Sequence, residues 1–379
     1  MQKIPFNRPA CVGREIENIE QAIKNGHLSG NGPFTKLCHA WLEEEIGCKK
    51  ALLTQSCTGA LIMSAILSDI QPGDEVIMPS FTFVSTANAF VTHGGVPVFV
   101  DIRPDTLDID ETKIEAAITP KTKAIVPVHY AGVGCEMDKI KALAEVHNLL
   151  VIEDAAQGIT AGYKDKPLGS FGQMAALSFH ETKNIISGEG GALLINDENL
   201  IDRAEIIWEK GTDRAKFFRG QIDKYTWIDK GASFLPGEIM AAFLYAQFEE
   251  VNSIRNRRIE IWNTYHEAFE ELENEGKIRR PIIPAHVNHN AHIYYLLLPD
   301  LNSRTIFIDK LQQNNVQAIF HYVPLHSSPA GKRYGRYHGD LSITQNVSDR
   351  LVRLPLWIEM SSAEIEQVIS ATYDALKQI

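Results

Sequence analysis

The chain has 379 residues, a length that predicts about two domains at roughly 100–200 residues each. Hydrophobic residues make up 44% of it and charged residues 22%, which is typical of a globular protein with a hydrophobic core. The net charge is −11 and no run of Lys or Arg offers the basic stripe that a nucleic-acid backbone requires, so nucleic acid is not an expected partner.

The cysteines and the N-terminal residues indicate the cellular compartment in which the protein is expected. Five cysteines are widely spaced, odd in number and without a C-x-x-C pair, so we expect neither a disulfide framework nor a thiolate zinc site, and a reducing cytoplasm is favoured. The N-terminus lacks an apolar signal segment, and no stretch approaches about 18 apolar residues. We therefore expect neither export nor a membrane span.

Between about residues 50 and 200, short apolar runs alternate with segments of helical length. Most of the runs lack polar alternation, as expected of strands that are buried on both faces of a largely parallel sheet. The alternation predicts an α/β sheet of seven strands with helices on both faces. The expected strands are residues 51–54, 75–79, 96–101, 124–129, 149–154, 175–179 and 192–196, and the expected helices include residues 60–69, 85–92 and 137–147.

The pattern changes after residue 208. Residues 209–235 are aperiodic and rich in aromatic and charged side chains, which is typical of a functional or interface loop. A long helical region follows, and its two apolar faces predict either one bent helix or two helices. We expect a large domain over residues 1–250, including an N-terminal arm, and a smaller C-terminal α+β domain over residues 251–379.

The expected elements of the smaller domain follow from the same patterns. Ser361 and Glu364 form a capping box for the last helix. The expected strands are residues 292–298 and 318–322, and the expected helices are residues 306–314 and 363–377.

Ligands of open α/β sheets bind beyond the carboxyl ends of the strands, so polar residues at these positions are candidate site residues. Residues 56–60, which include Thr58 and Gly59, follow the first strand and open a helix. Their small side chains and hydroxyls could hold an anion, or they could simply cap the helix. Phe83 follows the second strand and could stack on a flat ligand, or it could belong to the core.

Two ionisable residues follow later strands. Asp154 could meet a ring nitrogen of a ligand and favour its protonated form, or it could cap the next helix. Lys183 lies beside the glycine-rich residues 188–191, and its amine could form a Schiff base, or it could be a surface lysine. These glycines match neither the dinucleotide fingerprint nor the P-loop.

The C-terminal part contains histidines that are candidate ligands or substrate contacts. His286, His289 and His292 are spaced by three, but neither an acid nor a cysteine accompanies them, so we expect no metal site. His321 and His326 lie at the end of an expected strand, where they could line a cleft between domains or pack at the strand end.

The order of these parts is more specific than any one of them. A candidate phosphate cup, an aromatic residue, Asp154 and then Lys183 follow one another as in a pyridoxal phosphate site. The chain resembles the fold type I superfamily of aspartate aminotransferase and, within it, the DegT-type nucleotide-sugar aminotransferases. Residues 128–132, 178–184 and 217–221 are similar to the subgroup of dTDP-4-amino-4,6-dideoxygalactose transaminases. The family motifs lie at residues 30–35, 72–76, 153–157, 188–191, 322–326 and 353–356.

The resemblance implies roles for the matching positions. Lys183 and Asp154 would be catalytic, Lys183 holding pyridoxal 5'-phosphate covalently and Asp154 pairing with its ring nitrogen. Gly237 departs from the Ser or Thr that relatives usually carry before the acid, here Glu238. The other cofactor contacts would be Phe83 at the ring, Gln157 at the 3-hydroxyl, Thr58, Gly59 and Ser178 at the phosphate, and Ser233 at the phosphate of the neighbouring subunit. Substrate contacts would come from Glu189, His321, Tyr322 and His326.

The resemblance also implies a reaction. A homodimer with active sites at its interface would move an amino group from L-glutamate, through pyridoxamine phosphate, to C4 of dTDP-4-keto-6-deoxy-D-glucose. The product would be dTDP-4-amino-4,6-dideoxy-D-galactose, a precursor of enterobacterial common antigen or lipopolysaccharide. A 3-keto sugar nucleotide as acceptor, the C4-epimeric gluco product, and a PLP-binding regulator without activity remain as alternatives.

Overall fold

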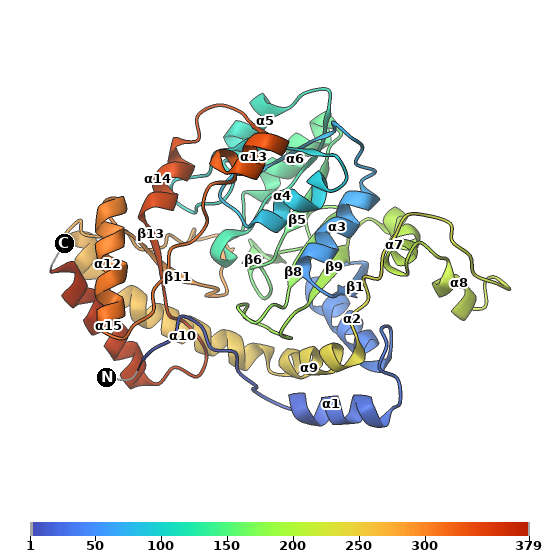
Figure 1. The fold of residues 1–379 in the computed structure, drawn as a ribbon, viewed down its shortest axis with the longest axis horizontal. Helices are drawn as coiled ribbons and strands as arrows, with labels where there is room; N and C mark the ends of the chain where they lie inside the picture. Colours follow the sequence, from blue (N-terminus) through green and yellow to red (C-terminus); the bar gives the residue numbers. More distant parts are fainter. Residues whose placement is uncertain (1–2, 378–379) are drawn as a thin grey trace.

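The computed structural model of the protein describes residues 3–377, and its centre is an eight-stranded sheet. All seven expected strands belong to this sheet, whose order is β1-β9-β8-β5-β4-β2-β3-β12 (Figure 1). Their bounds are β1 Lys50–Thr54, β2 Glu75–Pro79, β3 Val96–Val100, β4 Thr122–Ile125, β5 Leu150–Asp154, β8 Met174–Ser178 and β9 Gly191–Ile195. The seven runs therefore predicted the strands correctly, although β4 ends four residues earlier than expected.

The eighth strand corrects the expected strand number. β12 (Arg336–Tyr337) comes from the C-terminal part of the chain and pairs in parallel with β3. Because it has only two residues, it leaves no periodic pattern in the sequence.

The strand directions place two chain segments side by side. β5 and β8 are parallel neighbours, with Asp154 opposite Ala176. β9 then runs antiparallel between β8 and β1. The carboxyl ends of β5 and β8 consequently open on the same edge of the sheet, and the segment that joins β8 to β9 turns at that edge.

Successive strand residues pack on opposite faces of the sheet, as the strand period of two requires. Leu52 packs with α3 (Cys57–Leu67), α4 (Val84–Val91) and α7 (Ile201–Trp208). Its neighbour Leu53 packs with α2 (Pro33–Ile46) on the other face. Farther along this second face, α6 (Met137–His147) covers β4 and β5. Helices thus cover both faces, as predicted.

Two helices occupy the long helical region, α9 (Glu238–Glu249) and α10 (Val251–Ala268). Their packing links two hydrophobic cores. Ile254 of α10 belongs to the core under the large sheet, whereas Ile261 and Tyr265 belong to the core of the C-terminal part. Figure 1 shows these helices running along one side of the molecule. The domain boundary at residue 250 stays a prediction.

The C-terminal part is built on the antiparallel pair β11 (Tyr294–Leu297) and β13 (Leu351–Leu354). The capping box of Ser361 and Glu364 is present. The expected strand at residues 318–322 is wrong: it forms one bridge, between Ile319 and Arg353, and then leaves the sheet. Helices α12 (Leu301–Gln313), α14 (Ser342–Arg350) and α15 (Ser362–Leu376) pack around this pair.

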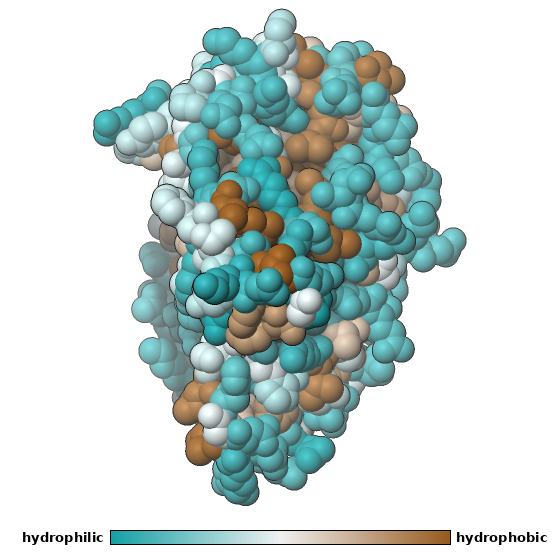
Figure 2. All heavy atoms as spheres, turned by 90° about the vertical axis from the view of Figure 1, so that its right-hand side faces the viewer, coloured by the Kyte–Doolittle hydropathy of each residue, from teal (hydrophilic) through white to brown (hydrophobic). Residues whose placement is uncertain are grey.

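Residues 209–235 form a projecting segment with the short helix α8 (Arg214–Phe218), which the aperiodic sequence did not predict. In Figure 1 it extends away from the sheet beside α7. Phe218 and Trp227 are exposed there, and Figure 2 shows apolar patches among hydrophilic surface on this side of the molecule. The expected role as an interface loop stays a prediction.

Short elements complete the described chain. They are α1 Glu15–Lys24, α5 Ile114–Ala117, α11 Glu270–Asn274, α13 Pro329–Tyr334, β6 Gly162–Tyr163, β7 Lys166–Pro167, β10 Val287–Asn288 and the 3₁₀ turns Glu111–Lys113, Tyr130–Gly132, Glu198–Leu200 and Leu325–Ser327. Over residues 3–377, we find no helix with the length and apolar composition that crossing a bilayer would require.

Candidate active site

A cavity of about 590 Å³ lies at the carboxyl ends of β5 and β8. Its wall includes the N-termini of α3 and α4, the segment between β8 and β9, and two segments of the C-terminal part, residues 319–322 and 353–356. The described residues that line it do not include Gly59, Ser233 or His326. Those predicted from the sequence that do line it are Thr58, Phe83, Asp154, Gln157, Ser178, Lys183, Glu189, His321 and Tyr322.

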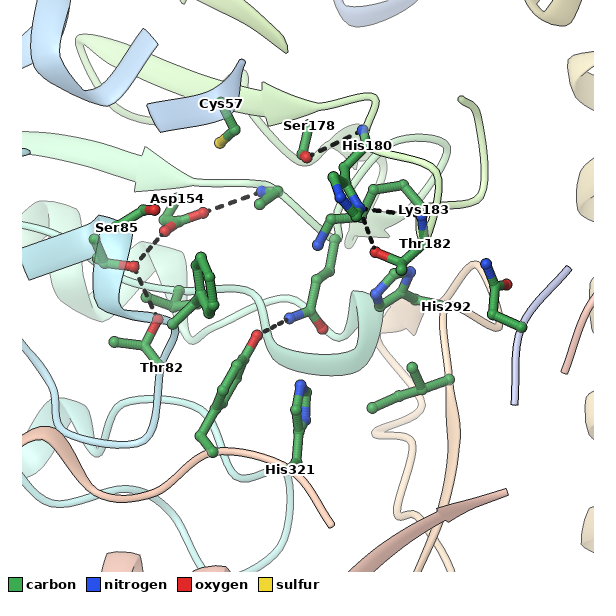
Figure 3. Close-up of a pocket in the computed structure, with 18 of the residues that line it drawn as sticks. Cys57, Thr82, Ser85, Asp154, Ser178, His180, Thr182, Lys183, His292 and His321 are labelled. Carbon is green, nitrogen blue, oxygen red and sulfur yellow. Dashed lines mark hydrogen bonds between the residues drawn. The ribbon is translucent and has the colours of Figure 1, made fainter. Parts of the chain in front are cut away.

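Lys183 reaches this cavity from the turn after β8. The turn is closed by backbone hydrogen bonds, among them Lys183 N–H to the His180 carbonyl at 2.9 Å. The side chain is partly buried and its Nζ forms no hydrogen bond to a described residue (Figure 3). Burial lowers the pKa of the Lys183 amine from its usual value, because an ammonium loses hydration there. The alternative of a surface lysine is thereby excluded.

Asp154 ends β5 and is held by two hydrogen bonds. The Thr86 hydroxyl donates to Oδ2 at 2.7 Å, and the Ala156 N–H donates to Oδ1 at 3.2 Å. Since Thr86 uses its hydrogen on Asp154, the Thr82 hydroxyl donates to Thr86 at 2.9 Å. These contacts fix the carboxylate at the cavity wall. The two threonines were not predicted, because nothing in their local sequence links them to a carboxylate 68 residues away.

Lys183 and Asp154 line the same cavity, and the carboxylate acts on the amine. The carboxylate of Asp154 raises the pKa of the Lys183 amine, although burial is the larger influence and lowers it. The Cys57 thiol lines the same cavity, and burial raises its pKa well above the usual value, with Asp154 adding to the increase. Cys57 is therefore a neutral thiol at this site.

Residues 56–60, at the N-terminus of α3, were expected either to cap the helix or to offer groups that hold an anion, and the structure contains both the cap and hydroxyls that line the cavity. The Ser56 hydroxyl accepts a hydrogen bond from the Gly59 N–H at 3.1 Å, so the cap is real. The Thr58 hydroxyl donates to Ser85 at 2.8 Å, and both residues line the cavity. A Cβ on Gly191 would lie 2.4 Å from the Cys57 nitrogen, so only glycine lets β9 approach this turn.

Aromatic residues form another part of the wall. Phe83 is 57% exposed, which excludes the core alternative for it, and its ring centroid lies 6.4 Å from that of Tyr322. Gln157 donates through Nε2 to the Tyr322 hydroxyl at 2.9 Å and accepts the Ala131 N–H at 2.7 Å. A flat ligand would therefore meet rings and an oriented amide.

His321 is stacked on Tyr322, with ring centroids 3.7 Å apart. Its Nδ1 lies 2.7 Å from the hydroxyl of the buried Tyr130. Burial lowers the pKa of His321 well below the usual value, and the Arg353 charge adds to this, so the imidazole is neutral near pH 7. His292 also lines the cavity and contacts the Asn184 side chain at 2.9 Å.

Three of the predicted residues lie at or beyond the edge of the cavity. The Glu189 carboxylate is at the rim, 3.7 Å from His180 Nε2. His326 lies outside the lining, with Nδ1 2.7 Å from the Ser80 hydroxyl. Ser233 is exposed and forms a β-bridge with Glu209 in the projecting segment. Their predicted contacts with substrate and cofactor stay predictions.

The histidines spaced by three have separate partners. His286 Nε2 lies 2.9 Å from Glu136, and His289 packs against Trp262. Among residues 3–377, no group of three His, Cys, Asp or Glu side chains could hold a metal ion.

Comparison with known proteins assigns the family. The profile of the DegT/DnrJ/EryC1/StrS aminotransferase family matches residues 9–372. The chain belongs to this family. It is 34% identical over 99% of its length to the spore coat polysaccharide biosynthesis protein SpsC of Bacillus subtilis, and covers 97% of that protein.

Solved structures of the family share the whole architecture. The aminotransferase TlmJ of Streptoalloteichus hindustanus is 27% identical, with a TM-score of 0.90 and 99% of both chains covered. The putative sugar aminotransferase Spr1654 of Streptococcus pneumoniae, in its PMP-form, is 25% identical, with a TM-score of 0.91 and 99% and 98% covered. The predictions of the fold type and of a PLP-dependent sugar aminotransferase of this family are confirmed.

Proposed function

We propose that the chain transfers an amino group from L-glutamate to C4 of dTDP-4-keto-6-deoxy-D-glucose, giving dTDP-4-amino-4,6-dideoxy-D-galactose. The observation that carries this proposal is the position of the Lys183 amine and the Asp154 carboxylate, which enter one cavity from neighbouring strands. The names of the similar proteins, a polysaccharide biosynthesis protein and a putative sugar aminotransferase, support a sugar as acceptor.

The residues of the cavity fit pyridoxal phosphate. Lys183 offers a primary amine without a hydrogen-bond partner in residues 3–377, and the oriented carboxylate of Asp154 suits a protonated ring nitrogen. Phe83 would stack on the ring and Gln157 would contact its 3-hydroxyl. Thr58, Gly59 and Ser178 would hold the phosphate at the positive end of α3, although the Gly59 N–H is already shared with Ser56.

When bound, pyridoxal phosphate supplies an electron sink for the carbon that loses a proton. Lys183 would attach the cofactor and, once released, its amine would take the proton from the donor's α-carbon and return it. A base must be unprotonated near the working pH, and burial shifts the Lys183 pKa in the required direction. Asp154 would keep the ring nitrogen protonated throughout.

The second substrate would occupy the side of the cavity that faces the C-terminal part. His321 and Tyr322 would contact the keto-sugar there, and Glu189 would reach it from the rim. We propose a homodimer in which the partner subunit's Ser233 would contact the cofactor phosphate, since Ser233 lies outside the cavity of its own chain. His326 lies outside the lining as well, so a contact with it requires a substrate that extends beyond the cavity.

Absorption spectroscopy tests the cofactor chemistry first. The purified protein should bind pyridoxal phosphate with a visible absorption band that L-glutamate bleaches, and Lys183→Ala should abolish the band. A protein that binds the cofactor but never converts it with any amino donor would support the non-enzymatic regulator instead.

The sugar is tested by direct competition. The 4-keto and the 3-keto dTDP-sugars are offered together, and the configuration at C4 of the product is determined by NMR. Preference for the 3-keto sugar, or a gluco configuration in the product, would replace the acceptor or product named above while leaving the aminotransferase assignment in place.

A further inference from the structure

The cavity wall contains a buried histidine whose second ring nitrogen is unused. His292 lies two residues before β11, is 6% exposed and lines the cavity on the side of Lys183 (Figure 3). Its Nδ1 contacts the Asn184 side chain, whereas its Nε2 has no hydrogen-bond partner among residues 3–377. Nε2 is accessible from the cavity that the ring lines. An accessible, unpaired nitrogen on an otherwise buried ring points to a ligand.

The neighbouring amide fixes which nitrogen of His292 carries the proton. Asn184 donates through Nδ2 to the Asn290 backbone carbonyl at 2.8 Å, and because a carbonyl only accepts, the amide has one possible orientation. Its Oδ1 therefore faces Nδ1 of His292, at 2.9 Å, and Nδ1 must donate. Burial lowers the pKa of His292 well below its usual value and the Lys183 charge adds to this, so the ring is neutral near pH 7. With its one proton on Nδ1, the imidazole presents Nε2 as an acceptor.

The backbone around His292 is held as firmly as its ring. Arg258 of α10 is 4% exposed and donates through Nε to the Ala291 carbonyl at 3.1 Å and through Nη2 to the His292 carbonyl at 2.6 Å. His292 is thus fixed at its backbone by Arg258 and at its ring by Asn184. The acceptor therefore has one position in the wall, as the recognition of a single substrate atom requires.

Two other side chains of this wall present donors. The Tyr130 hydroxyl donates to Nδ1 of His321 at 2.7 Å, which leaves the proton of the His321 imidazole on Nε2. The Tyr322 hydroxyl accepts a hydrogen bond from Gln157 at 2.9 Å and keeps its own hydrogen for a ligand. Two donors and the acceptor of His292 consequently line one cavity. An α-hydroxyketone matches them, because its carbonyl oxygen accepts and its neighbouring hydroxyl donates.

The two substrates differ in what they can give to the acceptor. The carboxylates of L-glutamate only accept hydrogen bonds, and its amino group must react with the cofactor. In the keto-sugar, the ketone carbon must reach the same place beside Lys183, and the next carbon, C3, carries a hydroxyl. Lys183 and His292 line the same cavity and the Lys183 charge acts on the ring, so a hydroxyl next to the reacting carbon comes to the His292 side.

Resting on the function proposed above, we infer that Nε2 of His292 accepts a hydrogen bond from the C3 hydroxyl of the keto-sugar. His292 is then a residue that determines substrate specificity, while His321 and Tyr322 donate toward the C4 oxygen. A sugar without the C3 hydroxyl leaves a buried acceptor unpaired, and a site built around a hydrogen bond discriminates strongly against such an analogue.

The inference is tested by comparing dTDP-4-keto-6-deoxy-D-glucose with its 3-deoxy analogue as substrates of the cofactor-loaded enzyme. The unmodified enzyme should use the 3-deoxy sugar with a kcat/KM that is lower by roughly 5- to 150-fold, the range for a buried acceptor left unsatisfied. His292→Phe should nearly abolish this preference, because a phenyl ring accepts from neither sugar. His292→Gln, whose side-chain oxygen accepts, should restore part of it.

His289→Phe is the matched control. His289 belongs to the same segment of the chain and packs against Trp262, but it lies outside the cavity lining. The variant should keep the full preference for the sugar that carries the hydroxyl. Loss of the preference in this variant as well would overturn the inference, since a disturbed segment would then explain both results.

Three further outcomes are distinguishable. Equal kcat/KM for the two sugars in the unmodified enzyme would overturn the inference, as would an unchanged preference in His292→Phe. Equal slowing of both sugars and of the half-reaction with L-glutamate in His292→Phe would also overturn it, because His292 would then act only on the Lys183 turn through Asn184. Absence of a cofactor band in the unmodified protein would reject the proposed function itself, a result that none of the other outcomes produces.

Discussion

The hydroxyl of Tyr130 lies 2.7 Å from Nδ1 of His321, and this contact joins the large sheet to the C-terminal part across the cavity. Tyr130 is 1% exposed, and burial raises the pKa of its hydroxyl well above the usual value, so the hydroxyl stays protonated. It has one hydrogen to give and His321 is its hydrogen-bond partner among the described residues. The imidazole therefore carries its proton on Nε2, which makes that nitrogen a donor.

Tyr130→Phe should release this orientation of His321. We expect the KM for the keto-sugar to rise several-fold, because the net contribution of one hydrogen bond is about 1 kcal/mol, with little effect on the half-reaction with L-glutamate. Steady-state and single-turnover kinetics separate the two effects. Tyr294→Phe is the control, since the buried Tyr294 hydroxyl has no hydrogen-bond partner among the described residues. Equal effects of both substitutions would contradict the proposed tautomer.

Thr86→Val should weaken cofactor binding. The substitution keeps the shape of the side chain but removes the hydroxyl that donates to Asp154 at 2.7 Å. A buried carboxylate that loses one donor costs about 1–3 kcal/mol, so affinity for pyridoxal phosphate should fall by roughly 5- to 150-fold. Titration of the visible band measures the affinity. Thr305→Val, which removes an exposed helical hydroxyl far from the cavity, should leave it unchanged; a similar loss there would point to a general effect on folding.

Lys183→Met should stabilise the cofactor-free protein near pH 7. Because burial lowers the Lys183 pKa in the folded state, the unfolded chain binds more protons over the pH window between the lowered value and the ordinary value of 10.5. Stability of the unmodified protein therefore increases as pH rises through that window, and the penalty of charging the amine is fully present below it. The advantage of the methionine variant should shrink toward pH 10.

Thermal unfolding of both proteins at pH 7 and pH 10 checks this dependence. Lys36→Met, which replaces an exposed lysine of α2, is the matched control and should change the unfolding temperature little at either pH. A lower unfolding temperature for Lys183→Met at pH 7 would mean that the attraction of Asp154 outweighs the burial of the amine.

Local patterns in the sequence predicted the strands and two of the central site residues, for a physical reason. Buried parallel strands are apolar on both faces, and Lys183 and Asp154 follow such runs directly, so their placement at one sheet edge follows from topology. Contacts between distant segments leave no such pattern. Thr86 bonds Asp154 from 68 residues away, and Tyr130 bonds His321 from 191 residues away. Neither pairing has a local signal in the sequence.

Contacts between distant segments also explain the missed strand β12 and the wrongly expected strand at residues 318–322. β12 is held in the sheet by β3 and not by its own two-residue sequence. Residues 318–322 have a strand-like composition, but the chain turns toward the cavity after Ile319, where Tyr322 bonds Gln157. Arg353 belongs to a family motif of the sequence, but that none of the described carboxylates pairs with it is a property of the folded chain.

Glu238→Gln should destabilise the whole fold. The Glu238 carboxylate is 1% exposed and accepts the N–H groups of Gly32, Phe34 and Thr35 at 2.8–3.1 Å, together with the Thr35 hydroxyl. It thereby caps the N-terminus of α2 from 203 to 206 residues away, where no side chain of the local sequence does so. An amide in its place would turn an NH₂ group toward at least one of these donors.

Leaving such a donor unsatisfied costs about 1–3 kcal/mol, and loss of the negative charge at the helix N-terminus adds to this. Urea unfolding of the purified protein measures the change, and the midpoint should fall while the slope stays constant. Glu249→Gln, at the exposed end of the same helix α9, is the control. Equal midpoints for the two variants would show that the carboxylate of Glu238 is not what holds α2, and that the neutral oxygen of an amide satisfies the same groups.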